Sequence, residues 1–500
     1  MTLEREVKLA VGPMFQVPDL TEVVPGAVAV DEGSDRFMAS YYDTPDLRLA
    51  RWGCALRYRT GEGWTVKLPI SVSEGRLDRD ERSFEAGPGR PPEGAVDLVR
   101  AYVRNAPVRL VVRLQTVRRR LGIEIDGERR IAEVVDDEVS VLDGRRVAGR
   151  FREVEVELTP DAEDGILDVI VARLDAGGVE ARSDLPKFVR ALQPRSVEPP
   201  DVLPGDPGRH AVVLDVIRAS VARSAERMLR HDAGVRLGED PEAVHQARVA
   251  TRRLRSDLRA YRPLLDPEWV AGLREELGWL GGELGTVRDL DVLDERLRGR
   301  IRSLPDDDID AAPKLLDRVR TERDAARMDL MSAMREPRYL SLLDRVVAAA
   351  AEPAVLPEVA GRPAAEVLGG LMEAPWRHLE QICEDLGPRS ADGELHQARI
   401  RAKRVRYAAE AMLPIFGKSA RRFARRAADL QMVLGEHQDA VLAIGWLRAQ
   451  AGGTAARGAF VAGELAGLEH LAQSEARAAW PAAWKALRPK KYRFWEVGDE

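Results

Sequence analysis

Cysteine is almost absent, because the 500 residues contain only Cys54 and Cys383. Two cysteines so far apart exclude a disulfide framework and a cysteine-rich zinc site. The sequence also lacks any run of about 18 apolar residues, the length that a membrane-spanning helix needs. Its first residues, MTLEREVKLAVG, carry charges where a signal peptide needs an apolar stretch. We therefore expect a folded, cytoplasmic protein without membrane segments.

An excess of positive charge is also missing, since the net charge is −6 at pH 7. The chain as a whole is therefore not a polycation that binds nucleic acid through bulk charge. Aromatic residues make up only 5% of the chain, whereas proteins that bind single-stranded nucleic acid interleave cations with aromatic stacking platforms. A base-free phosphate chain is thus favoured over nucleic acid as the ligand of any basic segment.

The chain has two parts with different periodicity. Residues 1–192 contain short alternating runs such as EREVKLAV and REVEVELT with helical pieces between them, which predicts an α+β domain built on a closed antiparallel β-barrel. Residues 193–208 hold five prolines in sixteen residues and are predicted to be a linker. Residues 209–500 show 3.6-residue periodicity, so we expect an all-α domain there.

The helical part contains an internal duplication. VHQARVATRRLRSDLRAY at 244–261 matches LHQARIRAKRVRYAAEAM at 395–412, an offset of 151 residues. LGTVRDLDVL at 284–293 matches LGEHQDAVLA at 434–443, an offset of 150 residues. Two independent segments thus agree on one repeat length. We therefore expect two helical bundles, at about 209–350 and 364–490.

Each copy of the first matching segment carries a stripe of cations on one side of an amphipathic helix. The stripe of the first copy is formed by His245, Arg248, Arg252, Arg255 and Arg259, and that of the second by His396, Arg399, Lys403 and Arg406. Only Glu410 interrupts the second stripe, and Tyr407 is the one aromatic residue near it. A face made almost entirely of cations repels itself unless an anion neutralises it. We therefore expect a long phosphate anion as ligand.

Carboxylates alternate along two strands of the first domain. Glu4, Glu6 and Lys8 share one face of the first strand, and Glu153, Glu155 and Glu157 share one face of a later strand. The simplest interpretation is a solvated outer face opposite buried valines. Like charges on one ladder are unfavourable, however, unless a cation lies between them. Arginines and lysines on neighbouring strands favour a site for a divalent metal and a triphosphate.

Residues 209–500 resemble the CHAD domain, the conserved histidine α-helical domain, a duplicated bundle that binds inorganic polyphosphate. The resemblance implies a polyphosphate-binding role for His245, Arg248, Arg252, Arg253, Arg255, His396, Arg399, Lys403, Arg404, Arg406 and His437. The stripe and the basic segment KSARRFARRAADL add Arg259, Arg422 and Arg425 to this set.

The ExExK motif at residues 4–8 resembles the start of the CYTH family, the triphosphate tunnel metalloenzymes. Members have an eight-stranded antiparallel tunnel and hydrolyse or cyclise triphosphates with Mg²⁺ or Mn²⁺. The resemblance implies phosphate-binding roles for Lys8, Arg57, Arg59, Lys67, Arg118 and Lys187, and metal-binding roles for Glu4, Glu6, Glu133, Asp137, Glu155 and Glu157. Glu4, Glu6 and Lys8 are the expected catalytic residues. Asp136 competes with Asp137, although strand parity with Glu133 favours Asp137.

Together the two resemblances predict a metal-dependent triphosphatase, with inorganic polyphosphate as the partner of the helical domain. A fused binder of base-free phosphate favours inorganic tripolyphosphate as substrate over thiamine or nucleotide triphosphates. Two alternatives stay open: a non-catalytic polyphosphate-binding adaptor, and an adenylate cyclase or organic-triphosphate hydrolase. A polyphosphate-binding domain also implies association with polyphosphate granules in the cytoplasm.

Overall fold

The computed structural model describes two compact units, Met1–Asp201 and Val202–Glu500, each of which is treated by itself. The boundary between them falls within the proline-rich segment 193–208. The described residues are 5–73, 76–127, 129–163, 165–183, 185–310, 312–452 and 456–496, with side chains described outside 70–79. Glu4, an expected metal ligand and catalytic residue, lies outside the described residues.

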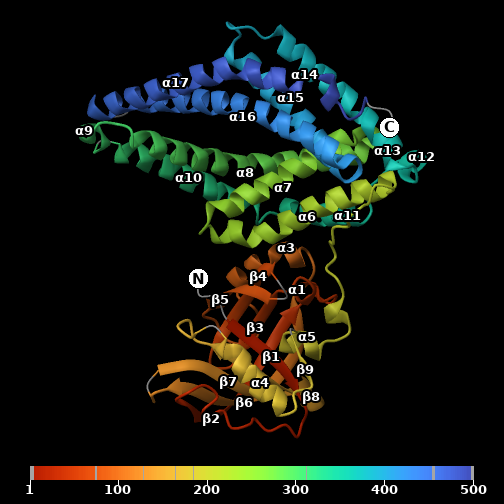
Figure 1. The fold of residues 1–500 in the computed structure, drawn as a ribbon, viewed down its shortest axis with the longest axis vertical. Helices are drawn as coiled ribbons and strands as arrows, with labels where there is room; N and C mark the ends of the chain where they lie inside the picture. Colours follow the sequence, from red (N-terminus) through yellow and green to blue (C-terminus); the bar gives the residue numbers. More distant parts are fainter. Residues whose placement is uncertain are drawn as a thin grey trace. The chain divides into compact units, whose positions relative to one another are not determined.

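The N-terminal unit is built on one antiparallel sheet (Figure 1). Its strands are β1 (Arg5–Val11), β2 (Ala27–Asp43), β3 (Ala55–Arg59), β4 (Gly63–Ser73), β5 (Arg76–Phe84), β6 (Arg109–Ile125), β7 (Arg129–Asp143), β8 (Arg146–Leu158) and β9 (Ala181–Arg182). They pair in the order β5-β4-β3-β2-β6-β7-β8-β1-β9. The CYTH resemblance implies eight strands, and the sheet has these and the two-residue β9 as a ninth. Among the described residues, no ladder joins the outermost strands β5 and β9.

The alternating pattern of β8 separates an apolar from a charged face of the sheet. Val154 and Val156 are fully buried and pack in one apolar cluster with Ile170 and Leu174 of α4 (Ile166–Ala176). Because successive side chains of a strand point to opposite faces, the glutamates between these valines lie on the other face. The valines are thus core residues, as the simplest interpretation of the sequence expects.

A short helix, α5 (Lys187–Ala191), packs beside the charged side of the sheet. The ring of Phe188 stacks on that of Tyr41 with 4.8 Å between centroids, in an apolar cluster that includes Leu114 and Val139. These packing contacts fix Lys187 next to the charged side chains. The other helices of this unit are α1 (Arg48–Arg51), α2 (Glu93–Leu98) and α3 (Arg100–Val103), with a 3-10 turn at Arg195–Val197.

The second unit is helical. Its longer helices are α6 (Val213–Leu237), α7 (Pro241–Ala260), α8 (Pro267–Ile301), α10 (Pro313–Ala333), α11 (Pro337–Ala351), α14 (Glu373–Asp385), α15 (Asp392–Ala411), α16 (Leu413–Ala451) and α17 (Ala456–Leu487). The shorter ones are α9 (Asp306–Ile309), α12 (Pro357–Ala360) and α13 (Ala364–Leu368), with 3-10 turns at Arg262–Leu264, Gly369–Met372 and Lys490–Tyr492. In the described part of the chain, no helix has the length and apolarity to cross a membrane.

The matching segments of the two repeats form α7 and α15, which are 20 residues long each and pack against one another. Asp240 caps α7 by accepting a hydrogen bond of 2.8 Å from the backbone nitrogen of Glu242. The apolar face predicted for this helix is buried, and Tyr261 at its end is fully enclosed. Its hydroxyl donates to the carbonyl oxygen of Ala411 at 2.9 Å, which links the two repeats.

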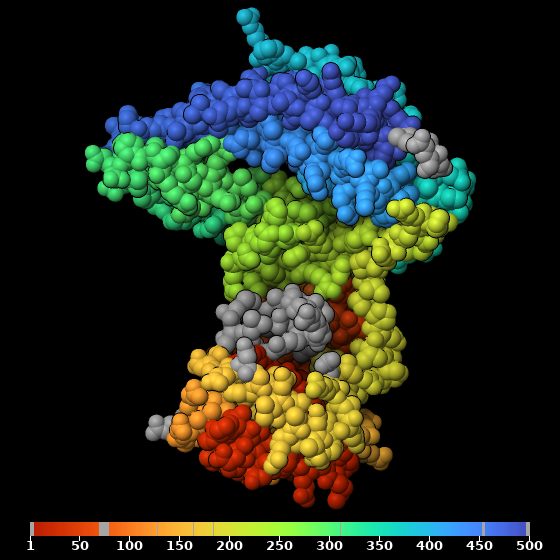
Figure 2. All heavy atoms as spheres, viewed as in Figure 1, coloured from red at the N-terminus to blue at the C-terminus, as the bar shows by residue number. Residues whose placement is uncertain are grey.

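The C-terminal part of α8 and helix α10 of the first repeat pack against α16 and α17 of the second repeat. Leu297 of α8 and Leu315 of α10 share one apolar cluster with Leu447 of α16 and Leu465 of α17. Figures 1 and 2 show this arrangement as a green band, α8 and α10, beside a blue one, α16 and α17. The basic helix α7 packs against α8, and the basic helix α15 packs against α16.

Candidate functional site

Strand register collects charged side chains on one face of the sheet. Directly paired residues share a face, and Lys8 of β1 pairs with Glu155 of β8. Asp137 of β7 pairs with Glu153 on one side and with Arg118 on the other. Extending the register through the remaining ladders defines what we call the charged face: Glu6, Lys8, Arg57, Arg59, Lys67, Arg118, Glu133, Asp137, Glu153, Glu155 and Glu157.

The centre of the charged face is a cluster of lysines and carboxylates. The Nζ of Lys187 lies 2.9 Å from Asp137, 2.7 Å from Glu153 and 2.8 Å from Glu155. Lys8 lies 3.0 Å from Glu155. Burial alone would lower the pKa of Lys187, but the surrounding carboxylates outweigh it and raise that pKa. The same lysines hold the pKa of Glu155 well below its usual range against the effect of burial.

Asp137 and Asp136 lie on opposite faces of β7. Asp137 is completely buried and accepts two hydrogen bonds from Arg118, at 2.9 and 2.7 Å. Asp136 pairs in the same way with Arg152 on the other face, at 2.8 and 2.6 Å. Because Lys187 also contacts Asp137, both oxygens of this carboxylate are already engaged. Asp137 thus orients Arg118. The oxygens of Glu155 are engaged in the same way, by Lys8, Lys187 and Arg118.

Two arginines of β3 form a separate end of the charged face. Arg59 lies 2.6 Å and Arg57 lies 3.4 Å from the carboxylate of Glu62. The guanidinium of Arg59 also covers the ring of Phe37, 3.6 Å from its centroid. Burial lowers the pKa of Arg59, and nearby cations such as Arg118 lower it further. Glu62 stands in a hairpin between two glycines with positive φ, at 90° and 88°, so its carboxylate is carried by an adaptable turn.

Hard divalent cations fit the donors of this face. Glu6, Glu133, Glu155 and Glu157 supply carboxylate oxygens, the ligands that Mg²⁺ and Mn²⁺ prefer. The three carboxylates around the Lys187 ammonium show that this face already stabilises a concentrated positive charge. In the described residues, no group of three or more His, Cys, Asp or Glu side chains is arranged to hold a metal ion.

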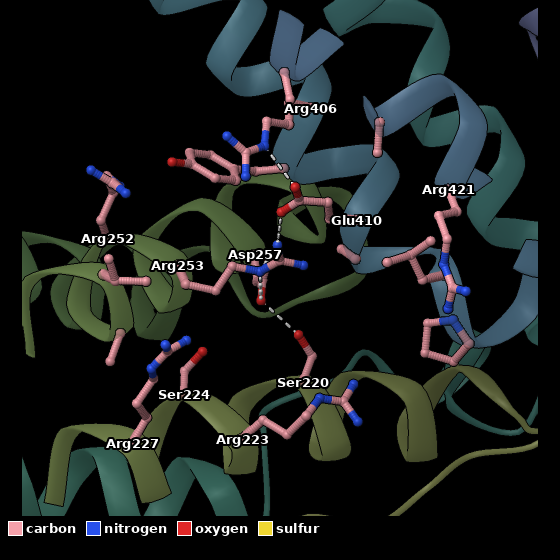
Figure 3. Close-up of a pocket in the computed structure, with 18 of the residues that line it drawn as sticks. Ser220, Arg223, Ser224, Arg227, Arg252, Arg253, Asp257, Arg406, Glu410 and Arg421 are labelled. Atoms are coloured by element: carbon pink, nitrogen blue, oxygen red, sulfur yellow. Dashed lines mark hydrogen bonds and ion pairs between the residues drawn. The ribbon is translucent and has the colours of Figure 1, made fainter. Parts of the chain in front are cut away.

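The helical unit contains a basic cavity of about 880 Å³ between α6, α7, α15 and α16. Its cationic lining consists of Arg223, Arg227, His245, Arg252, Arg253, Arg406, Arg421 and Arg425. We call this space the basic cavity. Figure 3 shows arginines that enter it from all four helices. Guanidinium groups that converge from several elements are suited to a ligand with many phosphate oxygens.

A chain of charged contacts crosses the basic cavity from one repeat to the other (Figure 3). Ser220 donates to Asp257 at 2.7 Å, and Asp257 accepts from Arg253 at 3.1 Å. Arg253 also pairs with Glu410 of the second repeat, and Glu410 accepts from Arg406 at 2.6 Å. Burial would lower the pKa of Arg253, but these carboxylates raise it. The two carboxylates therefore hold part of the cationic lining in place.

The aromatic exception noted in the sequence does not provide an open stacking surface. The side chain of Tyr407 is buried, with 7% of its surface exposed. The guanidinium groups of Arg252, Arg253 and Arg406 lie over its ring at 5.6 to 5.9 Å from the centroid. Tyr407 thus supports cations and leaves no ring face for a nucleobase.

Five of the predicted polyphosphate-binding residues line the basic cavity: His245, Arg252, Arg253, Arg406 and Arg425. Arg248 and Arg399 instead face carboxylates, Asp289 at 2.7 Å and Asp439 at 3.5 Å. His437 is buried, and its Nε2 lies 3.1 Å from Asp392. His396, Lys403 and Arg422 do not line the cavity, and Arg255, Arg259 and Arg404 belong to a different cluster.

Sequence reasoning missed two arginines of the basic cavity and two carboxylates next to the charged face. The arginines are Arg223 and Arg227, and the carboxylates are Glu62 and Glu81. Arg223 and Arg227 are four residues apart, so they form a short cationic stripe on α6 that could have indicated the cavity. Strand parity did place Glu153 on the face of Glu155, and Arg421 lies in the basic segment KSARRFARRAADL, but neither residue was given a role in a site.

Comparison with known proteins agrees with the two units. Residues 2–188 match the family model of the CYTH domain, and residues 219–448 match that of the CHAD domain. Two Mycobacterium tuberculosis proteins, "Uncharacterized protein MT2285" of strain CDC 1551 / Oshkosh and "Uncharacterized protein Rv2226" of strain ATCC 25618 / H37Rv, are each 30% identical over 476 residues. The match covers 87% of this chain and 85% of each relative.

Two solved structures resemble part of the chain. PptA from Streptomyces chartreusis is 25% identical with a TM-score of 0.47, and the match covers 55% of this chain and 100% of that one. The CHAD domain from the plant Ricinus communis is 29% identical with a TM-score of 0.49, and the match covers 57% of this chain and 96% of that one. The two domain matches and the full-length relatives together show that the chain belongs to the family of proteins that join a CYTH domain to a CHAD domain.

Proposed function

We propose that the N-terminal unit is a Mg²⁺- or Mn²⁺-dependent triphosphatase and that the helical unit binds inorganic polyphosphate. The observation that carries the catalytic part is the charged face, where Lys8 and Lys187 stand within 3.0 Å of Glu155 beside arginines from two further strands. Phosphoryl transfer depends mostly on positioning and on stabilising negative charge, and this face supplies groups for both.

In this proposal the carboxylates of the charged face bind the metal ion, and its lysines and arginines bind the phosphates. A divalent ion would be held by Glu6, Glu133, Asp137, Glu155 and Glu157, with Glu4, and would supply Lewis-acid polarisation of phosphoryl oxygens when bound. Lys8, Arg118 and Lys187 neutralise the phosphate that reacts, and Asp137 keeps Arg118 oriented. Arg57, Arg59 and Lys67 bind the distal phosphates, which compete there with Glu62 and Glu81.

Inorganic tripolyphosphate is the substrate that this proposal favours. The phosphate-binding residues are cations throughout, and the second unit offers an arginine-lined cavity in which Tyr407 presents no open ring. A unit that binds base-free phosphate chains favours a base-free phosphate chain as the substrate that the other unit hydrolyses. The two alternative functions predict different outcomes. An adenylate cyclase forms a cyclic nucleotide from ATP, and a non-catalytic adaptor forms no product.

The test is release of orthophosphate from tripolyphosphate by the full-length protein with Mg²⁺ or Mn²⁺, compared with Glu6→Gln. Glu138→Gln is the matched control, because Glu138 is an exposed carboxylate of β7 on the opposite face. Hydrolysis by wild type and the control, with none by Glu6→Gln, supports the triphosphatase. Equal release by Glu6→Gln, or formation of a cyclic nucleotide from ATP, would overturn it.

A further inference from the structure

The two repeats differ at the position that faces the basic cavity. With the offset of 151 residues, Glu410 of α15 corresponds to Arg259 of α7, and Ala250 of α7 corresponds to Arg401 of α15. In the basic cavity, Glu410 joins Arg253 to Arg406, and Ala250 lines the wall. The place that the repeat symmetry relates to this one is formed by the same two helices and carries arginine at both positions, Arg259 on α7 and Arg401 on α15. It therefore has no internal carboxylate where the cavity has one.

The arginines around Arg259 form a cluster of their own, which we call the arginine cluster: Arg255, Arg259, Arg274, Arg401 and Arg404. None of them lines the basic cavity. The guanidinium of Arg255 packs along α8, so close to Gly278 that a Cβ there would lie 3.1 Å from it. The cluster thus combines side chains of α7, α8 and α15 at the junction of the two repeats.

This cluster lacks a counter-charge in the part of the chain that the structure describes. No carboxylate of the described residues forms an ion pair with any of the five arginines. The Nε atoms of Arg274 and Arg404 are buried without a hydrogen-bond partner. Burial lowers the pKa of Arg404 to about 10, together with the neighbouring cations Arg259 and Arg401. Burial and other arginines lower the pKa of Arg259 and of Arg274 as well.

Arg255 and Arg259 are exposed to solvent, and Arg274, Arg401 and Arg404 are partly buried. Gathering these like charges without a carboxylate is unfavourable in the absence of an anion. Buried donors without partners and like charges in contact both raise the free energy of the folded state. Five guanidinium forks, however, match an anion with many oxygens in a row, since each fork can bind two oxygens at once. A phosphate chain has this geometry, and a carboxylate side chain has only two oxygens.

We propose that the arginine cluster is a second phosphate-binding site, separate from the basic cavity, in which an external polyanion takes the place that Glu410 occupies in the other repeat. The identity of the ligand as polyphosphate rests on the proposed function of the helical unit. The existence of an anion site rests only on the cluster itself. A phosphate chain that reaches both sites is held at two places, and a short anion fills only one.

The decisive variant is Arg259→Glu, which installs in the cluster the carboxylate that Glu410 provides in the cavity. The matched control is Arg377→Glu, the same charge change on an exposed position of α14. Binding of fluorescently labelled long-chain polyphosphate to the full-length protein is measured in EDTA at several salt concentrations. We expect Arg259→Glu to weaken binding by about 10- to 100-fold, since it removes phosphate contacts and adds repulsion. The salt dependence should become shallower by about one to two units of slope.

Wild-type affinity and salt dependence in Arg259→Glu would overturn the second site, as would an equal loss in the control. If wild type itself does not bind long-chain polyphosphate, the proposed function of the helical unit is wrong, and inorganic sulfate then tests the cluster. Sulfate should raise the thermal unfolding temperature of wild type more than that of Arg259→Glu. An equal rise in both proteins would refute an anion site at the cluster. Loss of folding is not expected, because the substitution relieves repulsion among the arginines.

Discussion

Substitution of Lys403 tests how much the cationic charge of the basic helices costs in folding free energy when no ligand is bound. Lys403 lies half-buried on α15, and burial together with the cations Arg399, Arg252 and Arg248 lowers its pKa from 10.5 to about 8. Asp439 is the carboxylate that opposes this effect. Replacing Lys403 by Met removes the charge and keeps most of the aliphatic chain. We expect Lys403→Met to be more stable than wild type in the absence of polyanions.

The expected gain follows from the size of the pKa shift. A difference of roughly 2.5 pKa units between the unfolded and folded states corresponds to at most about 3.5 kcal/mol, at about 1.4 kcal/mol per unit, and partial contact with water reduces it. Because the folded pKa is the lower one, the penalty is fully present below pH 8. Stability is regained as the pH rises from about 8 to 10.5, where the unfolded chain binds a proton that the folded one does not.

Calorimetric unfolding of the full-length protein tests this expectation. The transition of the helical unit is the one that long-chain polyphosphate shifts upward. At pH 7, Lys403→Met should unfold several degrees higher than wild type, at about 2–4 °C per kcal/mol. The difference should shrink at pH 10. An equal or lower unfolding temperature of the variant at pH 7 would refute the view that Lys403 is held charged against its surroundings. The affinity of Lys403→Met for polyphosphate should fall, because the protein offers the ligand one cation fewer.

Three further changes have defined outcomes. Glu62→Gln should bind metal-free tripolyphosphate more tightly than wild type in titration calorimetry with EDTA, since the two arginines of β3 are no longer neutralised; weaker binding would mean that Glu62 orients them. Glu469→Gln should lose about 3–5 kcal/mol of unfolding free energy in urea, because Glu469 is fully buried and accepts from Arg296 at 2.7 Å, and an unchanged midpoint would contradict this. Tyr261→Phe should cost about 1–3 kcal/mol in the same assay, because the buried carbonyl of Ala411 loses its donor; no loss would show that this bond adds nothing.

Elements with one buried face were predictable from the sequence. The alternation of β1, β7 and β8 and the cationic stripe of α7 both follow from side chains that must divide between core and surface. Strand β2 was missed, because Asp31–Arg36 is exposed over six residues and shows no alternation. Strand β5, RLDRDERSF, is polar along most of its length and was missed for the same reason.

Candidate residues were predictable only where their own strand or helix revealed them. Arg252 and Arg253 stand out in a basic motif, but Arg223 meets them only through the packing of α6 on α7. Glu410 pairs with Arg406 four residues before it, but its second partner, Arg253, is 157 residues away in the chain and no local pattern predicts that pair. Similarly, parity placed Asp137 on the same face as Glu133, but only the fold shows that Arg118 already occupies its oxygens.

The contacts between α7 and α15 show that an interface between fused repeats can be asymmetric in charge, whereas an interface between two identical chains cannot. In a dimer of identical chains, every residue occurs on both sides of the interface, so a carboxylate at the position of Glu410 would also appear at that of Arg259. Joining both copies in one chain removes that constraint, because each copy can change alone. One half of the interface can then neutralise itself through Arg253 and Glu410, while the other stays open to an anion, in every molecule and in a fixed order.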